Sequence, residues 1–343
     1  MTYKNRYHYK MTRFDNLQQF INTHLNAKSH TLNAITGDAS FRRYYRLSHG
    51  NKHLIVMDSD PKKVNNDPYI LLNQVFTEQG FLLPTIIASD EKQGFFVLSD
   101  LGSTHLADML NDVNRTEHYQ ALISLSAQWA QTPAASAMQA YNEGFIKLEL
   151  DIFSQWLVSD FINELLSAEQ KIMWQTSSEL LIKAMLEQPI VTVHRDYHSR
   201  NIMNSNGQWA IIDYQDAVRG PLCYDLVSLL RDCYFKLPQE ELTSLLDFAY
   251  QEFTEQNLVA NTSFDEFKYW FDLTGLQRHL KAAGIFCRLY LRDGKTGYLD
   301  NILPTLEYIA EVAANYPELK ALSEWTKNTI VPKVTEKLAK ERL

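Results

Sequence analysis

Glycine and proline are scarce in this chain, whose 343 residues include only 12 glycines and 10 prolines. Glycine stands at about half its usual frequency of roughly 7%, and the two residues together fall far below the level of low-complexity chains. This scarcity argues against a collagen, a disordered segment or a loop-rich sandwich. The length suggests about two structural units, at roughly 150 residues each, and a hydrophobic content of 45% allows each unit a core.

Cysteine, long apolar runs and net positive charge are also rare or missing. The three cysteines lie far apart, which disfavours a metal knuckle or a disulfide framework and indicates a reduced, cytoplasmic protein. No apolar stretch approaches the roughly 18 residues of a membrane span. A net charge of −8 disfavours electrostatic binding of nucleic acid by the protein as a whole. We therefore expect neither a membrane nor a nucleic-acid partner. The sequence allows a monomer without fixing the oligomeric state, and Met1 and Met11 are alternative starts.

Hydrophobic periodicity indicates a β-rich first part. A helix is expected over Phe14–Asn26, and residues 32–100 are expected to run strand, strand, strand, helix, strand, strand. Within that order, Phe41–Leu47 and His53–Asp58 predict a β-hairpin, because both are rich in β-formers and a short polar turn separates them.

Helical patterns dominate after Gly102. The expected helices are Tyr119–Gln131, Glu143–Leu166, Ala168–Glu187, Asp225–Phe235, Glu240–Gln256 and Phe264–Arg292. Only two short strands, Ile190–His194 and Trp209–Asp213, are expected to interrupt them. We therefore predict an α+β fold of two lobes: a small antiparallel β-rich lobe over residues 1–100 that binds nucleotide, and a larger, mostly α-helical lobe over residues 101–343 that holds the catalytic loop and the substrate site.

The most informative segment is VHRDYHSRNIMNSNGQWAIID, residues Val193–Asp213. It contains the pattern H-x-D-x-x-x-x-N, formed by His194, Asp196 and Asn201, and it ends in a buried-looking strand followed by an aspartate. This spacing suits phosphoryl transfer, because a loop aspartate can accept the proton of an acceptor hydroxyl while Asn and Asp oxygens hold Mg²⁺. A polar loop with an ordinary capping aspartate is the alternative.

With these residues the sequence resembles the protein-kinase-like superfamily, and within it the aminoglycoside phosphotransferase and choline kinase branch. It resembles more fully the bacterial anomeric kinases that act on N-acetylmuramate and N-acetylglucosamine in cell-wall recycling. This resemblance covers about residues 14–310 and rests on GDASFRRYYRL, VMDSDP, LSDLG, VHRDYHSRNIM, IIDYQDAVRGPLCYDLVSLLRDCY and GLQRHLKAAGIFCRLYLRDGKTGYL. It implies phosphorylation of the C1 hydroxyl of an amino sugar to the α-1-phosphate, with ATP and Mg²⁺ as cofactors.

The resemblance implies a role for each residue of the catalytic loop. Asp196 is similar to the family's catalytic base, and Asn201 and Asp213 match its magnesium ligands. His198 and Arg200 are candidates to contact the γ-phosphate or the sugar, with a purely structural role as the alternative. His194 is expected to hold the loop through backbone hydrogen bonds, and Asp225 is expected to do the same from the start of a helix.

The predicted nucleotide-binding residues are Gly37, Ser40, Phe41, Arg42, Leu98 and Asp100. Gly37–Phe41 would form the turn over the phosphates, and Val97–Asp100 would form the hinge that meets adenine. The chain departs from protein kinases here, because the turn holds a single glycine and the strand Ile55–Asp58 lacks the usual lysine. Arg42, Arg43, Lys62 and Lys63 are alternative sources of that positive charge, or simply solvated residues.

One helix carries a basic stripe. Arg278, Lys281, Arg288 and Arg292 fall on one face at 100° per residue. A solvated face is one interpretation. The other is that Arg278, Lys281 and Arg288 meet the carboxylate of an acidic sugar, since arginine binds carboxylates through bidentate contacts. Asp216 is a further substrate candidate whose role stays ambiguous.

Two other functions remain open. A kinase of the aminoglycoside or choline type would use another hydroxyl acceptor, but a cationic acceptor would want an acidic surface where this helix is basic. The absent strand lysine also allows a catalytically inactive, kinase-like binding module, against which stand the base and both metal ligands.

Overall fold

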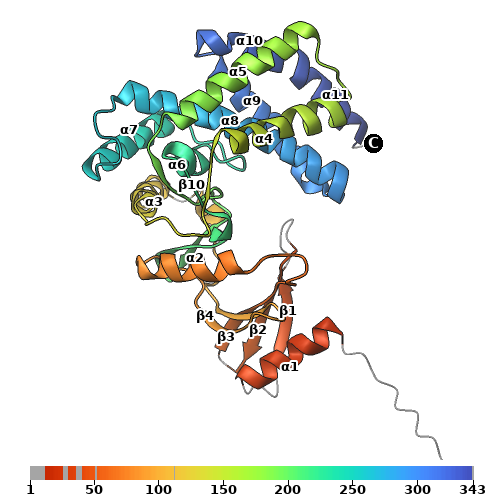
Figure 1. Cartoon of the computed structure of the whole chain (residues 1–343), viewed down its shortest axis with the longest axis vertical. Coiled ribbons are helices and arrows are strands. Elements are labelled where there is room, and N and C mark those ends of the chain that lie inside the picture. The colour runs from red at the N-terminus through yellow and green to blue at the C-terminus, as the bar shows by residue number, and fades with distance from the viewer. Residues whose placement is uncertain (1–11, 26–29, 36–40, 51, 112, 342–343) are drawn as a thin grey trace, which may run out of the picture. The chain divides into compact units, whose positions relative to one another are not determined.

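The computed structural model describes residues 12–25, 30–35, 41–50, 52–111 and 113–341 (Figure 1). Gly37 and Ser40 of the predicted phosphate turn, and both predicted starts, lie outside these residues. The chain forms two compact units, a first unit of residues 1–103 and a second unit of residues 104–343. None of the helices in the described ranges is long and apolar enough to cross a bilayer.

In its described residues the first unit is an antiparallel sheet with two helices. The sheet has the strand order β1-β2-β3-β5-β4. The elements are α1 (Arg13–Leu25), β1 (Thr31–Ile35), β2 (Arg43–His49), β3 (Lys52–Asp58), α2 (Asp67–Glu78), β4 (Ile86–Asp90) and β5 (Phe95–Ser99). The predicted hairpin and element order are confirmed.

Helix α1 and the sheet share the core of the first unit. Leu17, Phe20 and Ile21 on one face of α1 pack against Val56 of β3 and Phe95 of β5. Aromatic and β-branched side chains at alternate strand positions supply the other half of this core, as the period of a strand requires.

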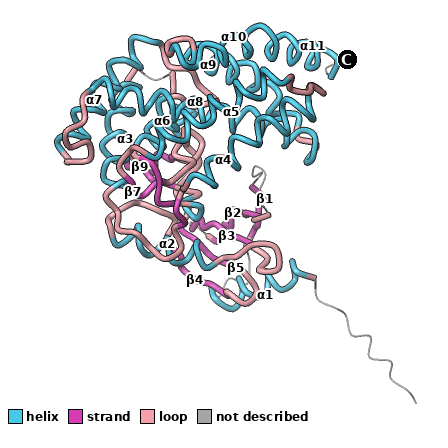
Figure 2. Tube along the Cα trace, turned by 45° about the horizontal axis from the view of Figure 1, so that its top comes forward, coloured by secondary structure: helices cyan, strands magenta, loops and turns pink. Residues whose placement is uncertain are grey.

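The second unit is mainly helical (Figure 2). Its α-helices are α3 (Arg115–Ala130), α4 (Glu143–Ile152), α5 (Ala168–Leu186), α6 (Cys223–Leu230), α7 (Gln239–Glu255), α8 (Phe264–Asp293), α9 (Ile302–Ala313), α10 (Lys320–Trp325) and α11 (Val331–Glu341). Its 3₁₀- or π-helical turns are η1 (Leu106–Met109), η2 (Phe153–Phe161), η3 (Tyr214–Asp216), η4 (Thr296–Asn301), η5 (Pro317–Leu319) and η6 (Thr326–Ile330). Its strands are β6 (Gln139–Ala140), β7 (Ile190–Val193), β8 (Ile202–Ser205), β9 (Gln208–Ile211) and β10 (Val218–Pro221).

The expectation of only two strands in the second unit was wrong. Strand β8 pairs with β9 in a hairpin, and β10 pairs antiparallel with β7 and parallel with β6. The hairpin has a turn signal in the sequence, because Asn206 and Gly207 both take positive φ angles, 53° and 85°. Strand β10 ends in glycine and proline, which weaken strand propensity, so its place in the sheet comes from tertiary pairing.

Two predicted helices end earlier than expected. The helix predicted to reach Phe235 ends at Leu230, because the next residues turn and Asp232 accepts the backbone N–H of Tyr234 at 3.0 Å. The helix predicted to reach Leu166 leaves α-geometry after Ile152 and continues as the π-helical η2. The residues after Asn301, for which no element was predicted, are almost entirely helical.

Helix α8 is the central helix of the second unit, and it packs on α4, α5, α6, α9 and η2. Gly284 marks the closest approach of α8 to another backbone. A Cβ atom at this glycine would lie 2.5 Å from the carbonyl oxygen of Ile152 and 2.8 Å from the nitrogen of Phe153. The lack of a side chain therefore lets α8 lie directly against the junction of α4 and η2.

Candidate active site

His194 fixes the start of the loop between β7 and β8. Its ring is fully buried, with Nε2 3.0 Å from the carbonyl oxygen of Ile212 and Nδ1 3.2 Å from the backbone nitrogen of Asp196. Burial lowers the pKa of His194 to about 4, so at neutral pH one ring nitrogen donates and the other accepts. These bonds confirm that His194 holds the loop.

Asp225, on the first turn of α6, holds the same loop from another side. Its carboxylate accepts the backbone N–H of His194 at 2.6 Å and that of Arg195 at 3.0 Å. Arg195 has a φ angle of 78°, a region that non-glycine residues rarely occupy. The two hydrogen bonds therefore stabilise a strained backbone next to Asp196, as predicted for Asp225.

Asp196 opens onto a cavity of about 130 Å³ within the second unit. The cavity is lined by Asp196, His198, Ser228, Asp232, Cys233, Tyr234, Arg278, Lys281, Ala282, Ile285 and Phe286. Burial works to raise the pKa of the Asp196 carboxyl, but Lys281, His198 and Arg195 outweigh it and leave the pKa below its usual value. Asp196 is therefore ionised at neutral pH. A second aspartate, Asp232, and two cationic side chains, Arg278 and Lys281, line the same pocket.

His198 and Arg200 both pack on Tyr234, which the sequence did not single out. The ring of His198 meets that of Tyr234 edge to face at 5.5 Å, on the wall of the pocket. The guanidinium of the exposed Arg200 lies 3.6 Å from the centre of the same ring. The structure therefore brings His198 to Asp196 and places Arg200 against Tyr234.

Asn201 and Asp213 lie at the open end of the β8–β9 hairpin. The ladder pairs Ile202 with Ile211, and the backbone nitrogen of Ile212 donates to the carbonyl of Asn201 at 3.0 Å. The side-chain amide of Asn201 donates to the carbonyl oxygen of Asp196 at 3.1 Å. Asp213 is exposed, has a left-handed φ of 65° and accepts a bond from Gln215 at 2.8 Å.

These two side chains have the donor chemistry that Mg²⁺ prefers, one amide oxygen and one carboxylate. In the described ranges no three His, Cys, Asp or Glu side chains group as metal ligands. A magnesium ion on Asn201 and Asp213 would therefore take its remaining ligands from water and phosphate. Asp216 is exposed at the end of η3, and its carboxylate lies 3.4 Å from the side-chain nitrogen of Gln215.

The basic stripe of α8 does not form a solvated face along its length. Arg278 and Lys281 are partly buried and line the Asp196 pocket, so the interpretation as a solvated face was wrong for these two. Arg288 is partly buried outside the residues that line the pocket, and the exposed Arg292 pairs with Asp293 at 2.8 Å. The sequence correctly predicted that these residues share one helix face. It did not predict which residues pack against that face.

Arg278 and Lys281 differ in how their charges are met. The ammonium of Lys281 lies 2.7 Å from the carboxylate of Glu149 and donates to the hydroxyl of Tyr224 at 3.1 Å. The guanidinium of Arg278 lies 4.8 Å from the centre of the Tyr224 ring. Across the described residues, no carboxylate lies within ion-pair distance of Arg278. Arg278 therefore has no direct ion pair among them, and only the longer-range attraction of carboxylates such as Asp196 and Asp225 offsets its charge.

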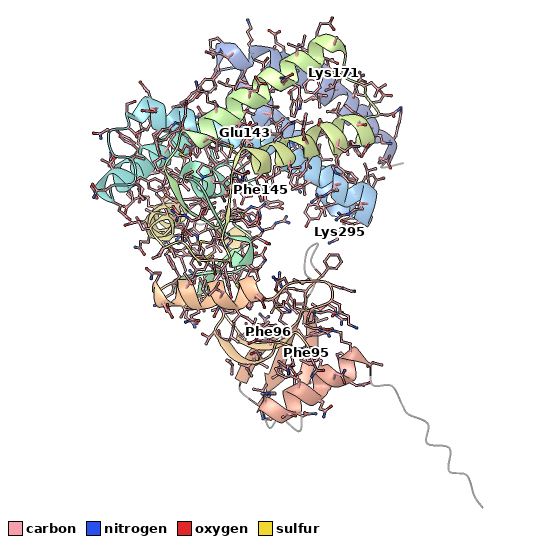
Figure 3. All side chains as sticks on the ribbon, viewed as in Figure 1. Phe95, Phe96, Glu143, Phe145, Lys171 and Lys295 are labelled. Atoms are coloured by element: carbon pink, nitrogen blue, oxygen red, sulfur yellow. The ribbon has the colours of Figure 1, made fainter. Side chains whose placement is uncertain are left out.

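Glu149 was missed by the sequence analysis. It lies on α4 between Ile146 and Leu150 and is buried with them. A glutamate inside the apolar face of a helix is the signal that would have found it, because buried carboxylates need partners. Figure 3 labels Phe145 near the start of α4, and the guanidinium of Arg195 lies 5.0 Å from the centre of that ring.

The first unit contains the described part of the predicted nucleotide site. Phe41 is exposed, and the guanidinium of Arg42 lies 5.9 Å from the Tyr69 ring centre. Arg43 instead pairs with the buried carboxylate of Asp58 at 2.5 Å, which Arg13 also binds.

The predicted hinge begins inside the sheet. Leu98 is buried in β5, a strand paired on both edges, with β3 and β4. Asp100 follows the end of that strand, pairs with Arg46 at 2.7 Å and accepts the backbone N–H of Gly102 at 2.9 Å. The chain thus leaves the sheet at Asp100, whose side chain is tied back to β2 through Arg46.

Residues 31–258 match the model of the phosphotransferase enzyme family. The chain belongs to this family. It is 34% identical over 289 residues to an N-acetylmuramate/N-acetylglucosamine kinase of Pseudomonas aeruginosa, covering 84% of this chain and 86% of that protein. It is 35% identical over 317 residues to a protein of the same name from Neisseria meningitidis serogroup B, covering 91% and 94%.

Solved structures of other phosphotransferases share the fold. An ethanolamine kinase of Plasmodium vivax superposes with a TM-score of 0.63 at 10% identity, covering 90% of this chain and 89% of that one. The GDP complex of aminoglycoside 2'-phosphotransferase-IIIa superposes with a TM-score of 0.61 at 15% identity, covering 89% and 99%. These likenesses confirm the predicted kinase-like fold, and the family assignment makes this chain a kinase that uses a nucleotide.

Proposed function

We propose that this phosphotransferase transfers the γ-phosphoryl group of ATP to the anomeric C1 hydroxyl of N-acetylmuramate and N-acetylglucosamine, giving the α-1-phosphate. The names of the curated relatives support this choice of acceptor. The observation that carries it in this chain is the pocket in which the Asp196 carboxylate lies beside the cations Arg278 and Lys281. A carboxylate can accept a hydrogen bond from the acceptor hydroxyl, and a cation can form an ion pair with the acid group of N-acetylmuramate.

In this proposal Asp196 orients the acceptor hydroxyl and receives its proton. Phosphoryl transfer passes through a loose transition state, so the hydroxyl needs little deprotonation before the new bond forms. A carboxylate whose pKa lies below its usual value is therefore adequate, because its main task is to align the attacking oxygen. His198 lines the same pocket and supplies a further polar contact for acceptor or phosphate. Arg200 would contribute positive charge from beside Tyr234.

Asn201 and Asp213 would hold the magnesium ion, which when bound neutralises charge on the phosphates. The hydrogen bond from the side chain of Asn201 to the backbone carbonyl of Asp196 would hold the metal site and the base in fixed positions relative to each other. Arg278 and Lys281 would meet an anionic acceptor, while Arg288 and Asp216 are assigned to the outer part of the acceptor site.

Gly37, Ser40, Phe41 and Arg42 would bind the nucleotide phosphates, and Leu98 and Asp100 would mark the hinge for adenine. ATP is the proposed donor and Mg²⁺ the proposed metal. All three cysteines are free, as a reducing compartment would keep them, so a cytoplasmic location belongs to the same proposal.

Replacing Asp213 by asparagine is expected to weaken binding of Mg·ADP by at least about tenfold, since loss of outer-shell partners alone costs that much at metal sites. Metal-free ADP should bind almost as before. Isothermal titration of ADP with and without Mg²⁺ measures both quantities. Asp247→Asn, which makes the same change at an exposed position of α7, is the control. Equal affinities for Mg·ADP in the Asp213 variant and the control would remove Asp213 from the metal site.

The proposed acceptor is tested by ATP turnover with N-acetylmuramate, N-acetylglucosamine, choline and an aminoglycoside. Turnover of the two amino sugars, with a ³¹P resonance from an anomeric phosphate, is the expected result. Turnover of choline or the aminoglycoside alone would favour the other branch of the family. Nucleotide binding without turnover of any acceptor would make the chain an inactive binding module.

A further inference from the structure

Glu149 is at the centre of a buried polar cluster behind the Asp196 pocket. One carboxylate oxygen accepts bonds from Arg195 at 2.8 Å and from Lys281 at 2.7 Å. The other accepts bonds from Tyr141 at 2.5 Å and Gln277 at 3.1 Å. Burial works to raise the pKa of Glu149, but Lys281 and Arg195 outweigh it and lower that pKa to about 2. Glu149 is therefore ionised throughout the physiological pH range.

The cluster reaches the pocket through Lys281 and through the loop that carries Asp196. Lys281 lines the pocket directly, and Arg195 is the residue before Asp196. Glu149 carries one negative charge and its two cationic partners carry one positive charge each, so the cluster holds a single net positive charge. Because the side chains of all three residues are at most 18% exposed, water screens this charge only weakly.

From this arrangement we infer that Glu149 sets how strongly the acceptor pocket prefers an anionic over a neutral amino sugar. The inference rests on the proposed function and concerns the same acceptor site. Glu149 partly neutralises Lys281, which lines the pocket, and Arg195, which precedes Asp196. Both acceptors can then bind: the remaining positive charge attracts the acid group of N-acetylmuramate, and N-acetylglucosamine meets no stronger charge. Glu149 is thus a specificity-determining residue that acts through Lys281 and Arg195 without touching the acceptor.

Glutamine fits the place of Glu149 without leaving its new amide unsatisfied. The amide nitrogen of Gln277 faces Glu149, while its side-chain oxygen is buried and has no hydrogen-bond partner. A half-turn of the Gln277 amide therefore brings an acceptor to the amide that Glu149→Gln introduces. Tyr141 can accept from the same amide through its hydroxyl oxygen. The substitution therefore removes the charge and keeps the shape.

Substitutions can set the net charge of the cluster to zero, one or two. Lys281→Met lowers it to zero, Glu149→Gln raises it to two, and the double variant returns it to the wild-type value of one. The quantity measured is the ratio of kcat/KM for N-acetylmuramate to kcat/KM for N-acetylglucosamine. This ratio should rise roughly tenfold in Glu149→Gln and fall roughly tenfold in Lys281→Met, the effect of one weakly screened charge near an anion. The double variant should lie within about twofold of the wild type, because its net charge is again one.

Glu143→Gln is the matched control, because it removes the same charge from an exposed position of the same helix, labelled in Figure 3. Its ratio should equal that of the wild type. A merely structural role of Glu149 would lower kcat/KM for both sugars alike and leave the ratio unchanged, which would overturn the inference. A double variant with a ratio as low as that of Lys281→Met would overturn it too, since the ratio would then follow Lys281 alone and not the net charge of the cluster.

Two further results keep the test decisive. If Glu149→Gln fails to fold, the double variant must still exceed Lys281→Met by roughly tenfold in the ratio, and equality of the two would refute the inference. Wild-type turnover of both sugars is measured first. Its absence would refute the proposed function itself, a different outcome from a ratio that does not follow the charge.

Discussion

Asp196→Asn is expected to lower kcat by roughly 10²–10⁴-fold, the usual contribution of a positioned general base. Asparagine keeps the size of the side chain and can still accept a hydrogen bond, but it cannot take up the proton of the acceptor hydroxyl. The loss should appear with N-acetylmuramate and N-acetylglucosamine alike, because both would present the same C1 hydroxyl. Steady-state turnover at saturating ATP gives kcat.

Nucleotide affinity separates this effect from misfolding. Asp196 belongs to the acceptor pocket, so the dissociation constant of ADP in the variant should stay within about twofold of the wild-type value. Asp247→Asn, an exposed substitution of the same kind on α7, should leave both kcat and ADP affinity unchanged. A kcat for Asp196→Asn equal to that of the control would exclude Asp196 as the base.

Gly284→Ala should lower the free energy of unfolding of the second unit by about 3 kcal/mol, the upper part of the usual range for overpacked sites. In an open helix this substitution would stabilise by up to about 1 kcal/mol, so the expected sign is reversed. The reason is the backbone of Ile152 and Phe153, which a new methyl group would meet at 2.5 and 2.8 Å. A backbone cannot rotate away as a side chain can, so α8 would have to shift.

Tryptophan fluorescence during urea unfolding measures this loss, because all six tryptophans lie in the second unit. Gly297→Ala is the control, since a Cβ at that exposed position would meet no atom within 4 Å and its φ is not positive. A Gly284 variant as stable as the Gly297 variant would show that the junction of α4 and η2 yields easily. Such a result would mean that the close approach of α8 to this backbone does not determine the free energy of unfolding.

The catalytic loop could be predicted from the sequence because its pattern is local. His194, Asp196 and Asn201 lie within eight residues of one another, and the strand that leads to Asp213 follows directly. The backbone roles of His194 and Asp225 were also predictable, because a polar loop between strands needs partners for its N–H groups. The metal and nucleotide roles of the named residues stay predictions.

The wall of the pocket could not be predicted in the same way. Glu149 and Lys281 are separated by more than 130 positions in the sequence, and only the packing of α4 on α8 brings them together. The spacing of Arg278 and Lys281 shows that they share a helix face but carries no information on what covers that face. The missed strand β8 is a different case, because Asn206–Gly207 is a hairpin signal that the sequence itself contains.

The short stretch between Asp213 and Asp225 has a consequence for control of the enzyme. In many protein kinases the corresponding segment is ordered only after phosphorylation, through new pairs with arginine. Here that stretch contains η3 and β10, and β10 is hydrogen-bonded to β7, while Arg195 already has Glu149 as its permanent counter-ion. The hydrogen bonds from Asp225 and the ion pair with Glu149 thus hold the catalytic loop in this structure through unmodified side chains.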